Sequence, residues 1–267
     1  MISGPRFKRL FKVMFLSAVV MAINGLWQAK ATASPIEIAT PTTLHGGDQF
    51  RVIFVTPNTV TTDATSSNVS VYNTIVQNYA NGFTYNGQTI SASAIVSVLG
   101  GVNAITNVGV HNVAVYMASG TEVAVSDNGT TGLFSANDLL AQPVQDLSGN
   151  SFTTGYVWTG TSGLGTQYNT NTNVGNVNWG LGGPSAPGVI DNTIDYTDHV
   201  EVGSLASTSG YSWLSLGFGT GLQLKTQSYQ IYGISDVLTV VPEPSTFLIS
   251  GLGVLMVGLA QRSRKRN

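Results

Sequence analysis

The chain has 267 residues, of which 9% are charged, and its formal net charge at pH 7 is −2. The basic residues gather near the two ends, so residues 34–240 hold only Arg51 and Lys225 against twelve Asp or Glu residues. Because Lys and Arg neutralise phosphates in nucleic-acid binding, this composition excludes nucleic acid as a partner. The chain has no cysteine, so its stability must come from a buried core, for which it is long enough.

The first 33 residues have the three parts of a secretory signal peptide. Basic residues stand at the start, an apolar stretch covers residues 13–27, and Ala31-Thr32-Ala33 has the small-x-small form of a signal-peptidase site. The apolar stretch is short for a permanent membrane span, which needs about 20 residues. We therefore predict that signal peptidase removes residues 1–33 and that the chain is exported. The alternative is a retained membrane helix.

Residues 34–240 are rich in Thr, Ser, Asn and Gly, and their apolar residues come in short runs bounded by turn-forming residues. This composition is typical of strands joined by loops. Val, Ile, Tyr, Phe and Trp, which favour strands, are densest in six of these runs. The predicted strands are residues 49–56, 112–118, 122–126, 155–159, 212–218 and 229–241.

Two segments have helical spacing instead. After residues 66–68, which offer three capping side chains, apolar residues recur at intervals of three and four up to Tyr79 and end before Asn81-Gly82. Residues 91–99 place three branched apolar side chains on one side and stop at Gly100-Gly101. The sequence thus predicts one α+β domain over residues 34–240 that is mainly β, with two short helices. A β-sandwich is the alternative fold.

Residues 160–188 are dense in Gly, Asn and Thr and are predicted to form a long surface loop region. The order of an early strand, two helices, Val157-Trp158-Thr159-Gly160, a loop with Asn178-Trp179-Gly180 and closing strands resembles the C-type-lectin-like fold. The disulfides of that family and its Glu-Pro-Asn or Gln-Pro-Asp sugar-binding signatures are missing here. The resemblance therefore concerns the fold and does not bring a sugar site with it.

Residues 241–267 contain three parts in a fixed order. Pro242-Glu243-Pro244 comes first, an apolar stretch at residues 247–260 follows, and a basic cluster closes the chain with Arg262, Arg264, Lys265 and Arg266. The prolines fix φ and remove backbone donors, so they keep this segment extended, as a peptide in the cleft of a processing enzyme must be. The apolar stretch would enter the bilayer, and the basic cluster would stay in the cytoplasm as a stop signal.

This order resembles the PEP-CTERM sorting signal. The resemblance implies an exported envelope protein of a Gram-negative bacterium that makes extracellular polysaccharide, with a tail cut in the membrane by an exosortase. The fourteen apolar residues would rise about 21 Å as a helix, less than the roughly 30 Å of the hydrocarbon core. A transient anchor tolerates that mismatch better than a permanent one. An ordinary tail-anchor helix, the alternative, leaves the paired prolines unexplained.

The body shows no sequence motif of an enzyme. No serine has the flanking glycines of a nucleophile elbow, and there is no zinc-protease motif and no phosphate-binding glycine loop. His45, His111 and His199 are scattered, although His199 lies between Asp198 and Glu201. Two carboxylates such as Glu122 and Asp127 could still meet in space without a sequence signature. We predict no catalytic residue and no enzyme activity.

Two candidate ligand sites remain in the body. Asp191, Asp195, Asp198 and Glu201 form its densest acidic set, and hard cations such as Ca²⁺ take several oxygen ligands from loops. A solvated acidic face explains the same residues equally well. Trp179, in the Gly-rich region, is the tryptophan expected to be exposed and to stack against a sugar, whereas buried aromatic residues are the commoner case.

The sequence therefore favours an exported envelope or extracellular-matrix protein, structural or adhesive in role, with signal peptidase, an exosortase-type enzyme and the membrane as partners. Extracellular polysaccharide is a further expected partner, since an acidic body can be bridged to it by divalent cations. The expected location is the inner membrane, through the C-terminal helix, and then the cell surface or matrix. A lectin-like carbohydrate-binding module is the alternative, and an envelope glycan hydrolase is a third hypothesis.

Overall fold

The structure is a computed structural model, and it describes residues 34–128, 132–135, 139–172, 175–183, 198–206, 210–217 and 221–242. The chain divides after residue 34, and every element described belongs to the second unit, residues 35–267. The predicted signal peptide with Ala31 and Ala33 lies outside the described residues. So do Glu243, Pro244, the apolar stretch at residues 247–260 and the basic cluster that follows it.

Short strands dominate the described residues. The helices are α2 Val69–Ala80, α3 Ala104–Val108 and the 3₁₀-helix η1 Gly210–Trp213. The strands are β1 Ile36–Glu37, β2 Gln49–Val55, β3 Phe83–Tyr85, β4 Gln88–Thr89, β5 Ala92–Ala94, β6 Ala114–Tyr116, β7 Glu122–Ala124, β8 Tyr156–Trp158, β9 Asn169–Thr172, β10 Gly175–Asn178, β11 His199–Ser204, β12 Leu222–Leu224, β13 Gln230–Ser235 and β14 Leu238–Thr239. The predicted α+β, mainly β fold is confirmed.

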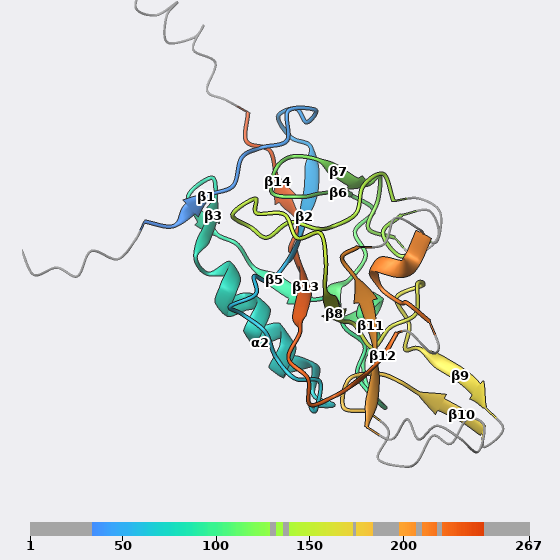
Figure 1. The fold of residues 1–267 in the computed structure, drawn as a ribbon. Coiled ribbons are helices and arrows are strands. Elements are labelled where there is room, and N and C mark those ends of the chain that lie inside the picture. The colour runs from blue at the N-terminus through green and yellow to red at the C-terminus, as the bar shows by residue number, and fades with distance from the viewer. Residues whose placement is uncertain are drawn as a thin grey trace, which may run out of the picture. The chain divides into compact units, whose positions relative to one another are not determined.

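Nine of the described strands form one mixed sheet (Figure 1). Its order is β12-β11-β8-β13-β2-β6-β7, with β14 also paired to β2 and β5 also paired to β13. Most neighbours are antiparallel, but β13 runs parallel to β8 and β2 runs parallel to β6. β1, β3 and β4 form a small separate sheet, and β9 and β10 form a hairpin. β2 and β13 thus lie at the centre, where both faces of the sheet are covered.

Alternate residues of the central strands belong to two different cores. In β2, Phe50, Val52 and Phe54 join one buried cluster, whereas Ile53 and Val55 join the other. Side chains alternate between the two faces of a strand, so each cluster occupies one face of the sheet. Helix α2 contributes to the first cluster, and α3 contributes to the second. A strand buried on both faces explains the nearly continuous apolar run of β2.

Helix α2 forms as the sequence predicts. Its N-cap is Asn68, whose side-chain oxygen accepts a hydrogen bond from Ser70 N, and its last residue is Ala80. Tyr72 and Val76 are fully buried in the first cluster. Gly233 of β13 makes this packing feasible, because a Cβ there would lie 2.5 Å from the ring of Phe54 and 2.7 Å from Val76.

The second predicted helix, residues 91–99, is wrong. The segment begins with strand β5 and continues extended, with Ile95 in one buried cluster and Val96 and Val98 in the other. A helix would bury one stripe of this segment, whereas an extended chain between two cores buries both sides. The second helix is α3, further along the chain, and Ser97 Oγ accepts a hydrogen bond from its first residue, Ala104, at 2.9 Å.

Two further expectations need correction. Of the strand predicted at residues 212–218, the described residues 212–217 form no strand: the chain leaves η1 and crosses β11 so closely that a Cβ on Gly203 would lie 1.7 Å from Trp213 O. Residues 160–188 are not simply a surface loop. They contain the β9–β10 hairpin, and Leu181 is fully buried and bonded through its backbone to Ser97 and Leu99. The other five predicted strand regions each contain a strand, and the last contains two.

Candidate functional site

The junction between the body and the C-terminal tail is built by the last strand. β14 pairs with β2 in antiparallel register, with Leu238 opposite Phe50 and Thr239 opposite Gln49. The pairing continues past the strand, because Val240 N donates to Asp48 O at 2.9 Å and Gly47 N donates to Val240 O at 2.8 Å. Val240 is 7% exposed and belongs to the first buried cluster. The fold thus holds the chain as far as Val240.

The partner of Val240 is a tight turn at residues 45–48. Asp48 N donates to His45 O at 3.0 Å, and His45 N donates to the Asp48 carboxylate at 2.8 Å. Gly47 has φ +97°, a left-handed conformation that glycine adopts without strain. The turn therefore has hydrogen bonds of its own in addition to the two that it shares with Val240.

Pro242 lies directly against this turn. An ideal Cβ on Gly46 would be 2.9 Å from the Cα, Cβ and Cγ atoms of Pro242, so the proline ring covers the position where other residues carry a side chain. Val241, which lies between Val240 and Pro242 in the chain, is 58% exposed and points away from the core. The chain therefore leaves the core after Val240 and is exposed at Val241. Pro242 then contacts the turn at a position that only glycine leaves open.

Residues 240–265 match the family model described as the PEP-CTERM protein-sorting motif. The chain carries a PEP-CTERM sorting signal. The predicted PEP-CTERM sorting signal is confirmed, and it identifies an exported protein that is sorted by an exosortase-type enzyme. A comparison with curated proteins gives no match. Over the residues that the structure describes, no helix is long and apolar enough to cross a membrane.

The PEP-CTERM signal begins where the body ends. Its first matched residue, Val240, is buried and hydrogen-bonded on both its N–H and its C=O, and its third, Pro242, is seated on Gly46. No free linker separates β14 from the sorting signal. The start of the signal is therefore part of the folded body, which the sequence alone did not reveal.

The predicted sugar-stacking residue is not available to a ligand. Trp179 has no exposed surface, so the expectation of an exposed Trp179 is wrong. Its backbone N–H donates to Tyr168 O and its C=O accepts from Glu201 N, which holds it between the β9–β10 region and β11. The glycines and asparagines around it suggested a surface loop, but hydrogen bonds to distant strands bury it.

The acidic set divides between different environments. Asp191 and Asp195 lie outside the described residues. Asp198 forms an ion pair with Lys225 Nζ at 2.5 Å, whereas Glu201 is completely buried. Within the described ranges, no three His, Asp or Glu side chains gather closely enough to hold a metal ion. Asp198 and Glu201 therefore lie in different environments, and the calcium site stays a prediction.

Glu201 is a buried acid in which only one of the two carboxylate oxygens accepts hydrogen bonds. Its Oε1 accepts from Ser215 Oγ at 2.8 Å and from Gly217 N at 2.9 Å, while Oε2 has no hydrogen-bond partner. Burial raises the pKa of Glu201 to about 8, and these hydrogen bonds only partly oppose the rise. Gly221 packs so closely that a Cβ there would lie 2.5 Å from Oε1. The raised pKa favours the protonated side chain at pH 7, and Ser215, Gly217 and Gly221 pack against it from outside β11.

A second buried carboxylate, Asp127, has a cation beside it. Arg51 NH1 donates to Asp127 Oδ2 at 3.0 Å, and both side chains are fully buried. The other donors of Arg51 reach Ser235 O at 2.6 Å and Val108 O at 2.8 Å, which joins β2 to β13 and to the end of α3. Burial raises the pKa of Asp127, but hydrogen bonds from Arg51 and from backbone N–H groups outweigh it and hold the pKa below its ordinary value.

His111 also contacts this pair, with its Nδ1 3.3 Å from Asp127 Oδ2 and its backbone N–H bonded to the same carboxylate. The pair is a structural node, by which we mean that it joins several elements through buried hydrogen bonds. The donors around Asp127 already occupy its carboxylate oxygens. Glu122, the other carboxylate named for a pair with Asp127, lies on β7 and is half-buried. The prediction that the body lacks catalytic residues stays a prediction.

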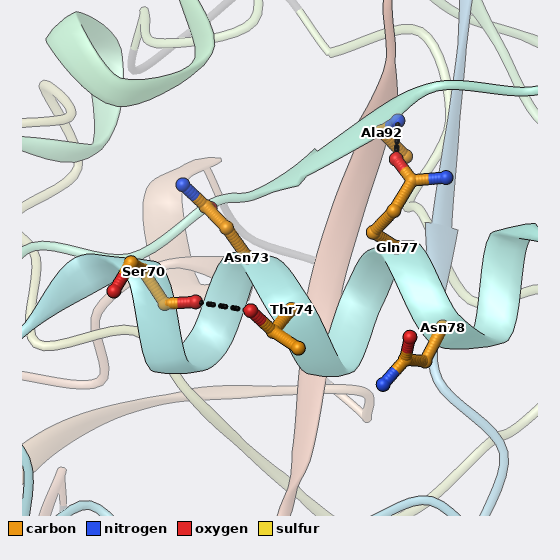
Figure 2. Close-up of a pocket in the computed structure, with 6 residues that line it drawn as sticks. All are labelled: Ser70, Asn73, Thr74, Gln77, Asn78 and Ala92. Atoms are coloured by element: carbon orange, nitrogen blue, oxygen red, sulfur yellow. Dashed lines mark hydrogen bonds between the residues drawn. The ribbon is translucent and has the colours of Figure 1, made fainter.

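A shallow pocket of about 330 Å³ lies along helix α2 (Figure 2). Its amide side chains are occupied: Gln77 Oε1 accepts from Ala92 N at 2.8 Å, and Asn73 Oδ1 accepts from Ala94 N at 2.9 Å. Gln77 Nε2 also donates to Ile90 O, and Asn107 donates to Ala94 O. These side chains cap the outer edge of β5, so the pocket offers a ligand few free polar groups.

Proposed function

We propose that the chain is an exported precursor whose tail is cut by an exosortase-type enzyme, and whose body serves as a non-catalytic structural or adhesive component of the cell envelope or extracellular matrix. The observation that carries the proposal is the PEP-CTERM match at residues 240–265, directly after β14. Signal peptidase first removes residues 1–33. The apolar stretch then holds the precursor in the inner membrane until the tail is processed.

The charge of the body supports an envelope role near polysaccharide. Its two basic residues are both used internally, Arg51 by Asp127 and Lys225 by Asp198. The remaining acidic residues give the body a net negative charge. Such a surface is repelled by anionic polymers unless divalent cations bridge the two. We propose that extracellular polysaccharide is bound in this way, weakly and through many contacts.

The sorting part is tested by determining both ends of the mature protein by mass spectrometry in its native host. The wild-type chain is compared with a variant in which Pro242, Glu243 and Pro244 are all replaced by Ala. We expect a start at Ser34 in both, and loss of the tail near Pro244 in the wild type only. An intact Arg266-Asn267 end in both chains would reduce the tail to a plain membrane anchor.

The adhesive part is tested with the mature protein and polysaccharide from the same host. Co-sedimentation is measured with millimolar Ca²⁺, with Mg²⁺ and with a chelator. We expect binding with either cation and its loss with the chelator, since the cations act by bridging. Binding that persists in chelator would show that the polysaccharide is held without a cation and would contradict the bridging proposal.

A further inference from the structure

The sorting signal is attached to the body by contacts that a flexible tail does not need. Val240 is hydrogen-bonded to Gly47 and Asp48 of the turn at residues 45–48, and Pro242 is seated on Gly46. We propose that this turn is a positioning element for tail processing, so that the folded body presents the sorting signal to its enzyme. The inference rests on the proposed function, because it concerns the same cleavage.

The geometry fixes the backbone of the first residues of the signal, as far as Pro242. The hydrogen bonds of Val240 continue the antiparallel pairing of β14 with β2, so the backbone reaches the signal in an extended form. The ring of Pro242 restricts its own φ and disfavours a helical conformation at Val241. The contact with Gly46 then fixes the ring in place. Three consecutive residues of the signal are therefore ordered before any enzyme binds.

Ordering before binding matters because a protease cleft takes up an extended peptide. Fixing the backbone of one residue costs free energy that corresponds to about tenfold in an equilibrium constant. A signal already ordered by the body does not have to meet this cost when it binds the enzyme. The side chains of His45 and Asp48 are 89% and 49% exposed beside the signal, so an enzyme that takes up the tail meets this turn as well.

We call the contact between Pro242 and Gly46 the clamp. It is tested with Gly46→Ala, which places a methyl group where Pro242 now lies. Gly82→Ala is the matched control, because its Cβ would meet only Tyr79 O at an ordinary 3.6 Å. Processing is followed by pulse-chase in the native host, and body stability by thermal unfolding of both variants. We expect Gly46→Ala to slow tail removal about tenfold while both variants keep nearly the wild-type melting temperature.

A second variant leaves Gly46 and the tripeptide Pro242-Glu243-Pro244 unchanged. Insertion of Gly-Ser-Gly-Ser between Val241 and Pro242 separates this tripeptide from the turn, and we expect it to slow processing to a similar extent. Because positioning acts on binding, a higher level of the processing enzyme should restore the rate for both variants. It should not restore the variant with three alanines at positions 242–244.

The outcomes separate the two proposals. If the three-alanine variant is processed like the wild type, the proposed sorting function is wrong. If that variant is blocked while Gly46→Ala and the insertion are processed at the wild-type rate, the sorting function stands and the clamp is wrong. Faster processing after the insertion would also overturn the inference, because it would mean that the body hinders the enzyme.

Discussion

The two buried carboxylates of the body have opposite environments. Asp127 lies against Arg51 and accepts backbone hydrogen bonds, and its pKa is below the ordinary value. Glu201 is as completely buried but has an oxygen without a partner, and its pKa is raised to about 8. Burial alone therefore does not decide the charge of an acid. The nearest cation and the number of donors do.

The largest expected effect is that of Asp127→Asn. The substitution keeps the shape of the side chain but leaves the Arg51 charge buried without a counter-ion. We expect the free energy of unfolding to fall by about 3 kcal/mol and the melting temperature of the mature protein by roughly 10 °C. Thermal denaturation followed by circular dichroism at pH 6 measures this. A change smaller than about 1 kcal/mol would show that the pair is not the node described.

Replacing the other acid, Glu201, by its amide should raise the free energy of unfolding. Glu201→Gln keeps the oxygen that accepts from Ser215 and Gly217 and removes a carboxylate that must ionise at high pH. At pH 9 we expect stabilisation by about 2 kcal/mol, and at pH 5 little difference. Urea unfolding at the two pH values is the measurement. Destabilisation at pH 9 would contradict the buried, proton-holding environment.

The pH dependence of the wild type follows from the same contrast. Between the ordinary glutamate value of 4.5 and about 8, the unfolded chain has lost the Glu201 proton while the folded chain keeps it. Stability should therefore decline as pH rises through this window. For Asp127 the sign is reversed: its contribution is present above its ordinary pKa and is lost in acid. A urea titration should show highest stability near pH 5, and Glu201→Gln should flatten the alkaline side.

The smallest expected effect is that of Lys225→Met. Lys225 pairs with Asp198, whose side chain is 49% exposed, so solvent screens the interaction. We expect a loss of at most about 0.5 kcal/mol. The variant is the natural control for Asp127→Asn, because each removes one member of an ion pair in the body. Comparable losses in the two variants would mean that burial does not separate them.

The sequence predicts best those features whose signals are contiguous. Helix α2 has its cap, its apolar spacing and its end within residues 66–82, and the sorting signal lies in one short stretch. The helix predicted at residues 91–99 is wrong because the apolar residues have helical spacing, although the segment is extended and contributes to both buried clusters. The prediction for Trp179 is wrong because its neighbours have a loop composition, whereas its backbone is bonded to Glu201 of β11, further along the chain, and its side chain is buried.

The buried node and the clamp could not be predicted because their members are far apart in sequence. Arg51 and Asp127 are separated by 76 residues, and no local pattern links them. One signal was present: a lone arginine inside the apolar run of β2 needs a buried counter-ion, and only a few acids could supply it. The seat of Pro242 depends on the absence of a side chain at Gly46, which has no signature until the fold brings the two together.

The hydrogen bonds that join the side chains of Asn73 and Gln77 to β5 affect how copies of this protein can associate after export. An uncovered strand edge can recruit the same strand of a neighbouring molecule and start aggregation. Here Asn73 and Gln77 already occupy the outward N–H groups of Ala94 and Ala92, as Figure 2 shows for Gln77 and Ala92. A second copy finds no vacant hydrogen-bonding row there. Many copies can therefore come together without fibre growth from this edge.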